Sequence, residues 1–153
     1  MLLVGPTLNI YKKEQIKMKT TQNKAILAYR ALPEILALRL GLRDSLNLLS
    51  LKKALELPFE FETQEEAKLI REFNLIQEGE EFVSSLPKDS PEYIEEMAAV
   101  TQRVIELKSM VIEIDHDPVT LHLKSSDMDN LYVSTGALVA LEDFVLFKEI
   151  EEE

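Results

Sequence analysis

The chain has 153 residues, with 28 acidic against 17 basic side chains and a formal net charge of −11 at pH 7. This length and the 46% hydrophobic content are typical of one globular domain with a buried core, which excludes wholesale disorder. The absence of cysteine excludes disulfides and thiolate chemistry, and the acidic surplus argues against direct contact with nucleic-acid phosphates. No run of about 18 apolar residues is present, so we expect no membrane-spanning helix.

The first 17 residues, Met1–Lys17, differ from the rest because they contain Gly5-Pro6 and show no helical spacing of apolar side chains. One interpretation is an N-terminal arm that packs on the domain. The other is a translated leader ahead of a natural start at Met18, since Lys13-Glu14 can be encoded by a purine-rich ribosome-binding sequence at a workable distance. In both cases we expect a single globular domain over residues 18–153.

A helical spacing of apolar residues begins after Thr21, which is a candidate N-cap. Pro33 predicts a kink or break in this helix, because proline removes a backbone donor and clashes with the preceding turn. Gly41 is expected to end the helical region, and Asp44 or Ser45 is expected to cap the next helix.

The next helix is rich in leucine. We expect its core face to consist of Leu46, Leu49, Ala54 and Leu57, widened by Leu48, Leu51 and Leu55. Pro58 predicts a second interruption. Thr63–Glu66 then has the sequence of a capping box, in which the hydroxyl and the carboxylate each pair with a free amide at the start of a further helix.

Residues Gln77–Ser90 are the best candidate for a loop, because Gly79 and Pro87 interrupt any regular period. Ser90-Pro91-Glu92 predicts a strong helix start. It combines a capping hydroxyl, a proline in the first turn and an acid near the positive end of the helix dipole.

The spacing of apolar residues changes from helical to alternating after this helix. Met110–Ile114 and Val119–Leu123 alternate and are rich in β-branched residues, and Asp115–Pro118 has the composition of a turn. We therefore predict a β-hairpin with a four-residue loop. Ser125–Asn130 is interpreted as a polar turn, and Leu131–Val133 as a short third strand.

Ser134 is the expected cap of a last helix, Thr135–Lys148, which is apolar on most sides and is therefore predicted to be largely buried. The predicted fold class is α+β and mostly α. It comprises four to five helices, a β-hairpin or small meander near residues 110–133, and a C-terminal buried helix.

Three parts of the chain have a recognisable order: Gln22–Leu32, with its Asn-Lys…Ala-Tyr…Leu pattern; the acidic stretch Phe59–Phe73; and Leu107–Ile114 followed by Ser134–Phe144. Together they resemble a family of small bacteriophage and prophage proteins of uncharacterised function, which has a long charged helix, a strand and hairpin, and a terminal Leu-Glu helix. Pro33 and Pro58 depart from the unbroken helices of that family. The resemblance covers most of residues 18–147 and implies a viral or prophage origin and a start at Met18. It transfers no catalytic residues.

Few segments carry the side chains that catalysis or metal binding requires. Asp115-His116-Asp117 with His122 is the histidine-containing cluster, but neighbours in a tight turn diverge, which favours a turn over a Zn²⁺ or Mn²⁺ site. Asp127–Asn130 resembles the start of a calcium loop but lacks the later glycine and acid. Ser134–Ala137 has one glycine and no following lysine, which favours a helix cap over a phosphate cradle. We therefore expect no catalytic, cofactor-binding or metal site.

Acidic side chains gather in the helical region around residue 65. The candidate partner-binding residues are Glu60, Glu62, Glu65, Glu66 and Glu72. Paired carboxylates can perform acid/base chemistry, but this stretch has no neighbouring histidine or phosphate-binding loop. The alternatives are a solvated helix face and a surface that contacts a basic protein.

These features favour a non-enzymatic, phage-type protein-binding or assembly protein that acts through an acidic helical surface. Its expected partner is a protein, for which a basic surface would be favourable, or a second copy of itself. We expect no direct contact with nucleic acid or membrane. The alternative is an inhibitor of a host defence or nucleic-acid-binding protein, whose carboxylates imitate a phosphate backbone. We expect it in the host cytoplasm or the virion and not secreted.

Overall fold

The computed structural model describes residues 18–129 and 131–151, and over these residues the protein is α+β and mostly helical, as predicted. The elements in chain order are β1 (Met18–Thr21), α2 (Gln22–Leu36), α3 (Leu42–Glu72), β2 (Leu75–Glu78), β3 (Glu81–Ser84), α4 (Pro91–Ser109), β4 (Val111–Ile114), β5 (Val119–Lys124), α5 (Ser125–Asp129), α6 (Thr135–Leu141) and β6 (Val145–Ile150). The segment 1–17, interpreted above as an N-terminal extension packed on the domain or as a translated leader, lies outside the described residues.

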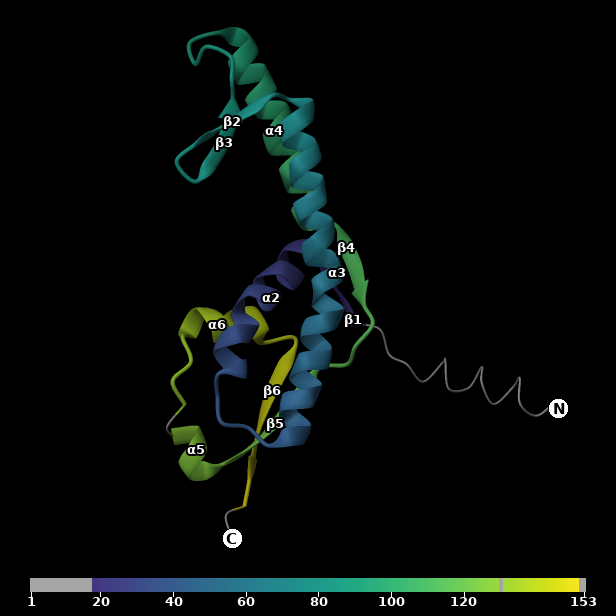
Figure 1. Ribbon diagram of the computed structural model, residues 1–153, viewed down its shortest axis with the longest axis vertical. Helices are drawn as coiled ribbons and strands as arrows, with labels where there is room; N and C mark the ends of the chain where they lie inside the picture. The colour runs from purple at the N-terminus through teal and green to yellow at the C-terminus, as the bar shows by residue number, and fades with distance from the viewer. Residues whose placement is uncertain (1–17, 130, 152–153) are drawn as a thin grey trace, which may run out of the picture.

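The molecule is elongated along α3, which runs through both of its parts (Figure 1). The lower part, which we call the body, gathers α2, α5, α6 and the strand pairs β1–β4 and β5–β6 around the first half of α3. The upper part, which we call the arm (residues 59–109), contains the second half of α3, the β2–β3 hairpin and α4 (Figure 1). A helix of 31 residues spans about 46 Å, which explains how α3 reaches from one part to the other.

The core lies in the body and joins α2, α3, α6 and the strands into one cluster. Its buried side chains are Ala25, Ala28, Leu32, Ile35, Leu48, Leu51, Leu55, Ile114, Val119, Leu121, Leu141, Phe144 and Val145. Those of α2 recur at spacings of three and four residues, and those of β5 alternate, so each element presents one apolar face. Val119, Leu121 and Leu123, which alternate along β5, are all buried.

The leucines of α3 face differently from the prediction. Leu48, Leu51 and Leu55 are fully buried, whereas Leu46, Leu49 and Leu57, which we expected in the core, are exposed. Both sets have helical spacing, so periodicity alone does not distinguish the inner face from the outer one. The contact with α2 decides between them.

The breaks predicted at Pro33 and Pro58 are wrong, because α2 continues to Leu36 and α3 runs through Pro58 as one helix. A proline inside a helix costs about 3 kcal/mol. Burying a leucine side chain contributes roughly 1.5–3 kcal/mol, and α3 buries Leu48, Leu51 and Leu55 before Pro58 and Leu69 after it. Packing therefore outweighs the cost of the proline.

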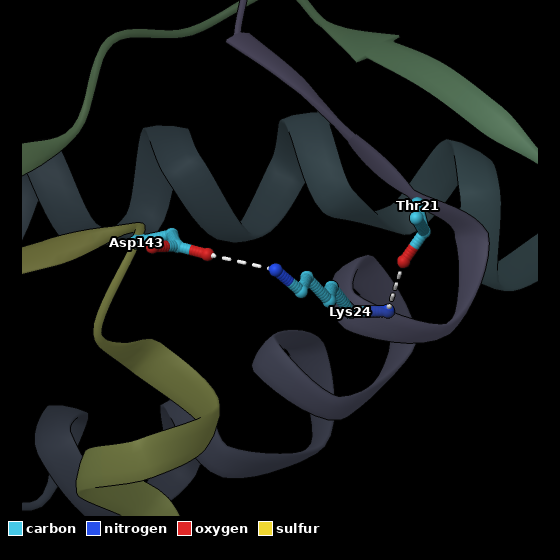
Figure 2. Close-up of polar contacts among 3 residues, drawn as sticks. All are labelled: Thr21, Lys24 and Asp143. Carbon is cyan, nitrogen blue, oxygen red and sulfur yellow. Dashed lines mark hydrogen bonds and ion pairs between the residues drawn. The ribbon is translucent and has the colours of Figure 1, made fainter. Parts of the chain in front are cut away.

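Three predicted N-caps are confirmed. The hydroxyls of Thr21, Ser90 and Ser134 accept hydrogen bonds from the third amide beyond each, at 3.2 Å, 3.2 Å and 3.1 Å. Figure 2 shows the first of these, together with the 3.5 Å ion pair between Lys24 and Asp143 that links α2 to the start of β6. Because both charged side chains are exposed, this pair contributes about 0–1 kcal/mol.

The other predicted helix boundaries are wrong. Gly41 does not end the first helix but occupies the N-cap position of α3, so neither Asp44 nor Ser45 is a cap. The capping box at Thr63–Glu66 is not formed, because Thr63 lies inside α3 and its hydroxyl donates to the carbonyl of Phe59 at 3.1 Å. The continuation of α3 through Pro58 removes the free helix end that such a box would need.

The segment predicted as a loop between Gln77 and Ser90 begins instead with an antiparallel hairpin. Strands β2 and β3 pair from Leu75↔Ser84 to Glu78↔Glu81. The connection contains Gly79 at a φ of 65°, which suits the two-residue turns that favour hairpins.

The predicted hairpin between Met110 and Leu123 is also wrong, because its two strands pair elsewhere. Strand β4 pairs antiparallel with β1, with Met18 opposite Ile114, and β5 pairs parallel with β6, with Val119 opposite Val145. The alternating pattern identifies a strand but does not specify its partner. The described residues form five helices, as the predicted count of four to five allows, and three of them precede these two strands.

The C-terminal region also differs from the prediction. Helix α6 ends at Leu141, and the second half of the predicted helix Thr135–Lys148 is strand β6. Leu131–Val133 forms no strand, and the predicted polar turn at Ser125–Asn130 is helix α5 up to Asp129, with Asn130 outside the described residues. A short apolar run fits a helix or a strand, and the open edge of β5 favours the strand.

Candidate functional site

A groove of about 550 Å³ lies in the arm between the second half of α3, the β2–β3 hairpin and α4. Apolar side chains from all three elements line it: Leu69, Ile70, Leu75, Phe82, Val83, Met97, Val100, Val104 and Ile105. The exposed carboxylates of Glu66, Glu80 and Glu81 border the groove, and Lys108 is the basic side chain that lines it. The groove is therefore apolar inside and net acidic at its margin.

Side-chain hydrogen bonds hold the walls of this groove in place. The buried hydroxyl of Ser84 donates to Glu96 at 2.6 Å, and the Ser84 amide donates to the sulfur of Met97 at 3.2 Å, which fixes β3 on α4. Arg103 of α4 pairs with Glu72 of α3 at 3.3 Å. The groove is thus a preformed feature of the arm.

The arm has a thin core for its length. Among its apolar residues, Leu69 and Val100 are buried, whereas Ile76, Phe82, Leu86, Ile94 and Ile105 are exposed. Phe82 and Ile105 line the groove, and apolar side chains exposed in a groove typically mark a site where another molecule binds.

The five acidic residues predicted to bind a partner do not form one continuous surface. Glu60 is exposed, Glu65 pairs with Lys68 at 3.0 Å, and Glu72 pairs with Arg103. Glu66 borders the groove. Glu62 points into the protein and is only 5% exposed, so its assignment to an exposed acidic surface is wrong.

Glu62 is an unusual buried carboxyl at the junction of arm and body. Its Oε1 atom has no hydrogen-bond partner among the described residues. Burial raises the pKa of Glu62 above its ordinary value of 4.5, the nearby charge of Glu66 raises it further, and Lys108 and Arg30 oppose both effects. An acid in such surroundings favours its neutral form.

Each histidine forms hydrogen bonds with a residue of α3 that is distant in the chain. The buried carboxylate of Asp44 accepts from the His122 amide at 2.7 Å and lies 3.2 Å from its Nδ1 atom. His116 contacts the hydroxyl of Ser50 at 3.0 Å through Nε2. Within residues 18–129 and 131–151, no three acidic or histidine side chains are placed to hold a metal ion.

Sequence reasoning missed the hairpin side of the groove, because Gly79 and Pro87 made the segment look like a loop. The available signal was the two short apolar runs on either side of Gly79, Leu75–Ile76 and Phe82–Val83, and Leu75, Phe82 and Val83 line the groove.

No helix in the part of the chain that the structure describes is both long and apolar enough to cross a bilayer. Comparison with protein-family models, with curated proteins and with solved structures finds no match to this chain.

Proposed function

We propose that this is a non-enzymatic, phage-type protein-binding or assembly protein, and that the groove of the arm is its contact surface. The observation that carries the proposal is the combination of an apolar groove between two helices and a hairpin with three carboxylates at its margin. The phage-type part of the proposal rests on the resemblance of Gln22–Leu32 and Ser134–Phe144 described above.

The chemistry of the groove indicates the chemistry of its partner. Apolar walls on α3 and α4 accept the apolar face of an amphipathic helix, as helix-in-groove complexes do. Glu80 and Glu81 would then attract lysine or arginine residues that flank this face. The partner segment is therefore apolar on one side and basic at its edges.

The alternative function, inhibition through imitation of a phosphate backbone, requires a row of unpaired carboxylates. The burial of Glu62 and the ion pairs of Glu65 and Glu72 remove three members of the row that the sequence offered. This favours binding through the groove over imitation of a nucleic acid.

A displayed library of random peptides, screened against the immobilised full chain, tests the proposal without knowledge of the natural partner. We expect enrichment of peptides with apolar residues at helical spacing and flanking lysine or arginine. Ile105→Asp, inside the groove, should weaken these peptides about 10-fold or more, as loss of about 1.4 kcal/mol does. Val139→Asp, at a similarly exposed site on α6, is the matched control.

A second pair of variants separates the margin from the general charge of the protein. Glu81→Lys should weaken the selected peptides, whereas Glu142→Lys, an exposed acid outside the groove, should not. Selected peptides whose binding is insensitive to both Ile105→Asp and Glu81→Lys would overturn the proposal. Binding of nucleic-acid enzymes that vanishes at moderate salt and ignores Ile105→Asp would favour the inhibitor instead.

A further inference from the structure

The groove of the arm is lined by charged side chains of both signs. The carboxylates of Glu66, Glu80 and Glu81 and the ammonium group of Lys108 are exposed along it. Within residues 18–129 and 131–151, none of these side chains forms an ion pair. A molecule that brings opposite charges into the groove therefore gains contacts that the free protein lacks.

Lys108 differs from the other basic residues of the arm. Three of the arm's five basic side chains already pair with acids of the arm: Lys68 with Glu65, Lys88 with Glu78, and Arg103 with Glu72. The other two are Arg71, which does not line the groove, and Lys108, which does. Lys108 is thus the basic side chain that a partner in the groove would meet.

Lys108 lies at the end of the stripe of side chains that α4 contributes to the groove. The stripe has the spacing of three and four residues that places side chains on one side of a helix, and it consists of Met97, Val100, Thr101, Val104, Ile105 and Lys108. From Met97 to Lys108 the helix rises about 16 Å, or about three turns. A partner helix of similar length that packs along this stripe would reach Lys108.

The acids of α3 that lie near Lys108 do not bind it directly. Burial raises the pKa of Glu62, and the charge of Lys108 opposes this effect, which shows that the two side chains are neighbours. Neither Glu62 nor Glu66 comes within ion-pair distance of Lys108, however. The exposed ammonium group is therefore open to an acid from another molecule.

We infer that the partner segment carries an acidic residue that pairs with Lys108, in addition to the basic residues that meet Glu80 and Glu81. This inference rests on the proposed function, because it assumes an amphipathic helix in the groove. The opposite charges come from different walls, Lys108 from α4 and the two carboxylates from the β2–β3 hairpin. The bound helix is then basic toward the hairpin and acidic toward the end of α4, which fixes its rotation in the groove.

A charge exchange between protein and peptide tests this pairing. Among the peptides selected on the full chain, we expect a recurring aspartate or glutamate beside the apolar face. Lys108→Glu should weaken these peptides about 5-fold or more, because it replaces an ion pair with two like charges. A lysine in place of the peptide's acid should weaken binding to the unchanged protein and restore binding to the Lys108→Glu variant. Fluorescence anisotropy of labelled peptides measures each combination.

Arg71→Glu serves as the control, since it reverses an exposed basic side chain of the arm that lies outside the groove. It should leave the affinity for the selected peptides unchanged. Far-ultraviolet circular dichroism checks that both variants are folded. A residue that only supported the fold of the arm would not give restoration by the exchanged peptide.

The inference and the proposed function fail in different ways. Peptides that depend on Ile105 but have no recurring acid, or that bind the Lys108→Glu variant as well as the unchanged protein, overturn the inference and leave the groove as the contact surface. Failure of the exchanged peptide to restore binding to the Lys108→Glu variant overturns it as well. Peptides that are insensitive to both Ile105→Asp and Glu81→Lys overturn the inference together with the proposed function.

Discussion

Gln22, at the start of α2, donates a hydrogen bond of 2.6 Å from its side-chain amide to the carbonyl of Pro58 in the middle of α3. Gln22 is 1% exposed, and its Oε1 atom has no hydrogen-bond partner among the described residues. The bond joins two helices at the boundary between body and arm, next to the proline that was expected to break the second of them.

This contact predicts a difference between two substitutions of similar size. Gln22→Met removes the donor together with the unpaired oxygen, so we expect a loss of about 1 kcal/mol, the net value of one hydrogen bond. Gln22→Glu places a second acceptor against the Pro58 carbonyl and should cost more, roughly 2–3 kcal/mol. Urea unfolding measures both, with Gln64→Glu on the exposed side of α3 as the control. Equal stability of the two variants would contradict this account.

Asp44 and His122 predict an unequal pair of losses. Asp44→Ala removes both contacts of the carboxylate and leaves the His122 amide without its partner, so we expect a cost of about 2 kcal/mol. His122→Ala keeps the 2.7 Å bond from the backbone amide and should cost clearly less. Thermal unfolding of the two variants side by side is the measurement. A larger loss for His122→Ala would show that the ring, and not the amide, holds α3 on β5.

Glu62 predicts a stability that depends on pH. Because its pKa is raised in the folded protein, the folded state holds the proton more tightly than the unfolded chain does. The free energy of unfolding should therefore decrease as the pH rises from the ordinary value of 4.5 through the raised pKa. Glu62→Gln, which carries no charge, should be more stable than the unchanged protein at neutral pH.

The gain from Glu62→Gln should shrink as the pH falls to about 4, where the carboxyl is largely protonated in both states. Urea midpoints at about pH 4 and about pH 7.5, for this variant and the exposed control Glu60→Gln, give the comparison. A gain that is the same at both pH values would refute the assignment of this pH dependence to Glu62.

The cap of α4 predicts a small and specific loss. The Ser90 hydroxyl accepts from the Tyr93 amide at 3.2 Å and donates to the Pro87 carbonyl at 2.6 Å. Ser90→Ala should cost about 1 kcal/mol, the usual value for a helix cap. Ser85→Ala, at an exposed position of the preceding loop, should be nearly neutral. The shift in thermal midpoint between the two variants decides the point.

Local chemistry predicted three of the helix starts, whereas the starts expected at Asp44 or Ser45 and at Thr63 are absent. Thr21, Ser90 and Ser134 each lie a few residues from the amides that they pair with, so their role depends on a short stretch of chain. The strand character of β4 and β5 was equally readable, because alternation is a property of neighbouring residues.

The pairing of strands that are distant in the chain could not be predicted from local sequence. β4 pairs with β1, about 90 residues before it, and β5 pairs with β6 in a parallel register that needs a long crossover. The site was predicted less well than the fold. Of the acidic residues named from the sequence, Glu66 borders the groove, while Phe82 and Val83 come from a segment assigned to a loop.

The amino-acid sequence by itself determined the class of the fold, the capped helix starts, and the surplus of 28 acidic over 17 basic residues. Tertiary structure alone decided which leucines of α3 are buried, that α3 continues through Pro58, and where the acidic side chains point. The physical reason is one of range. Caps and alternation are set by hydrogen bonds and geometry within a few residues, whereas burial and ion pairing depend on elements that only folding brings together.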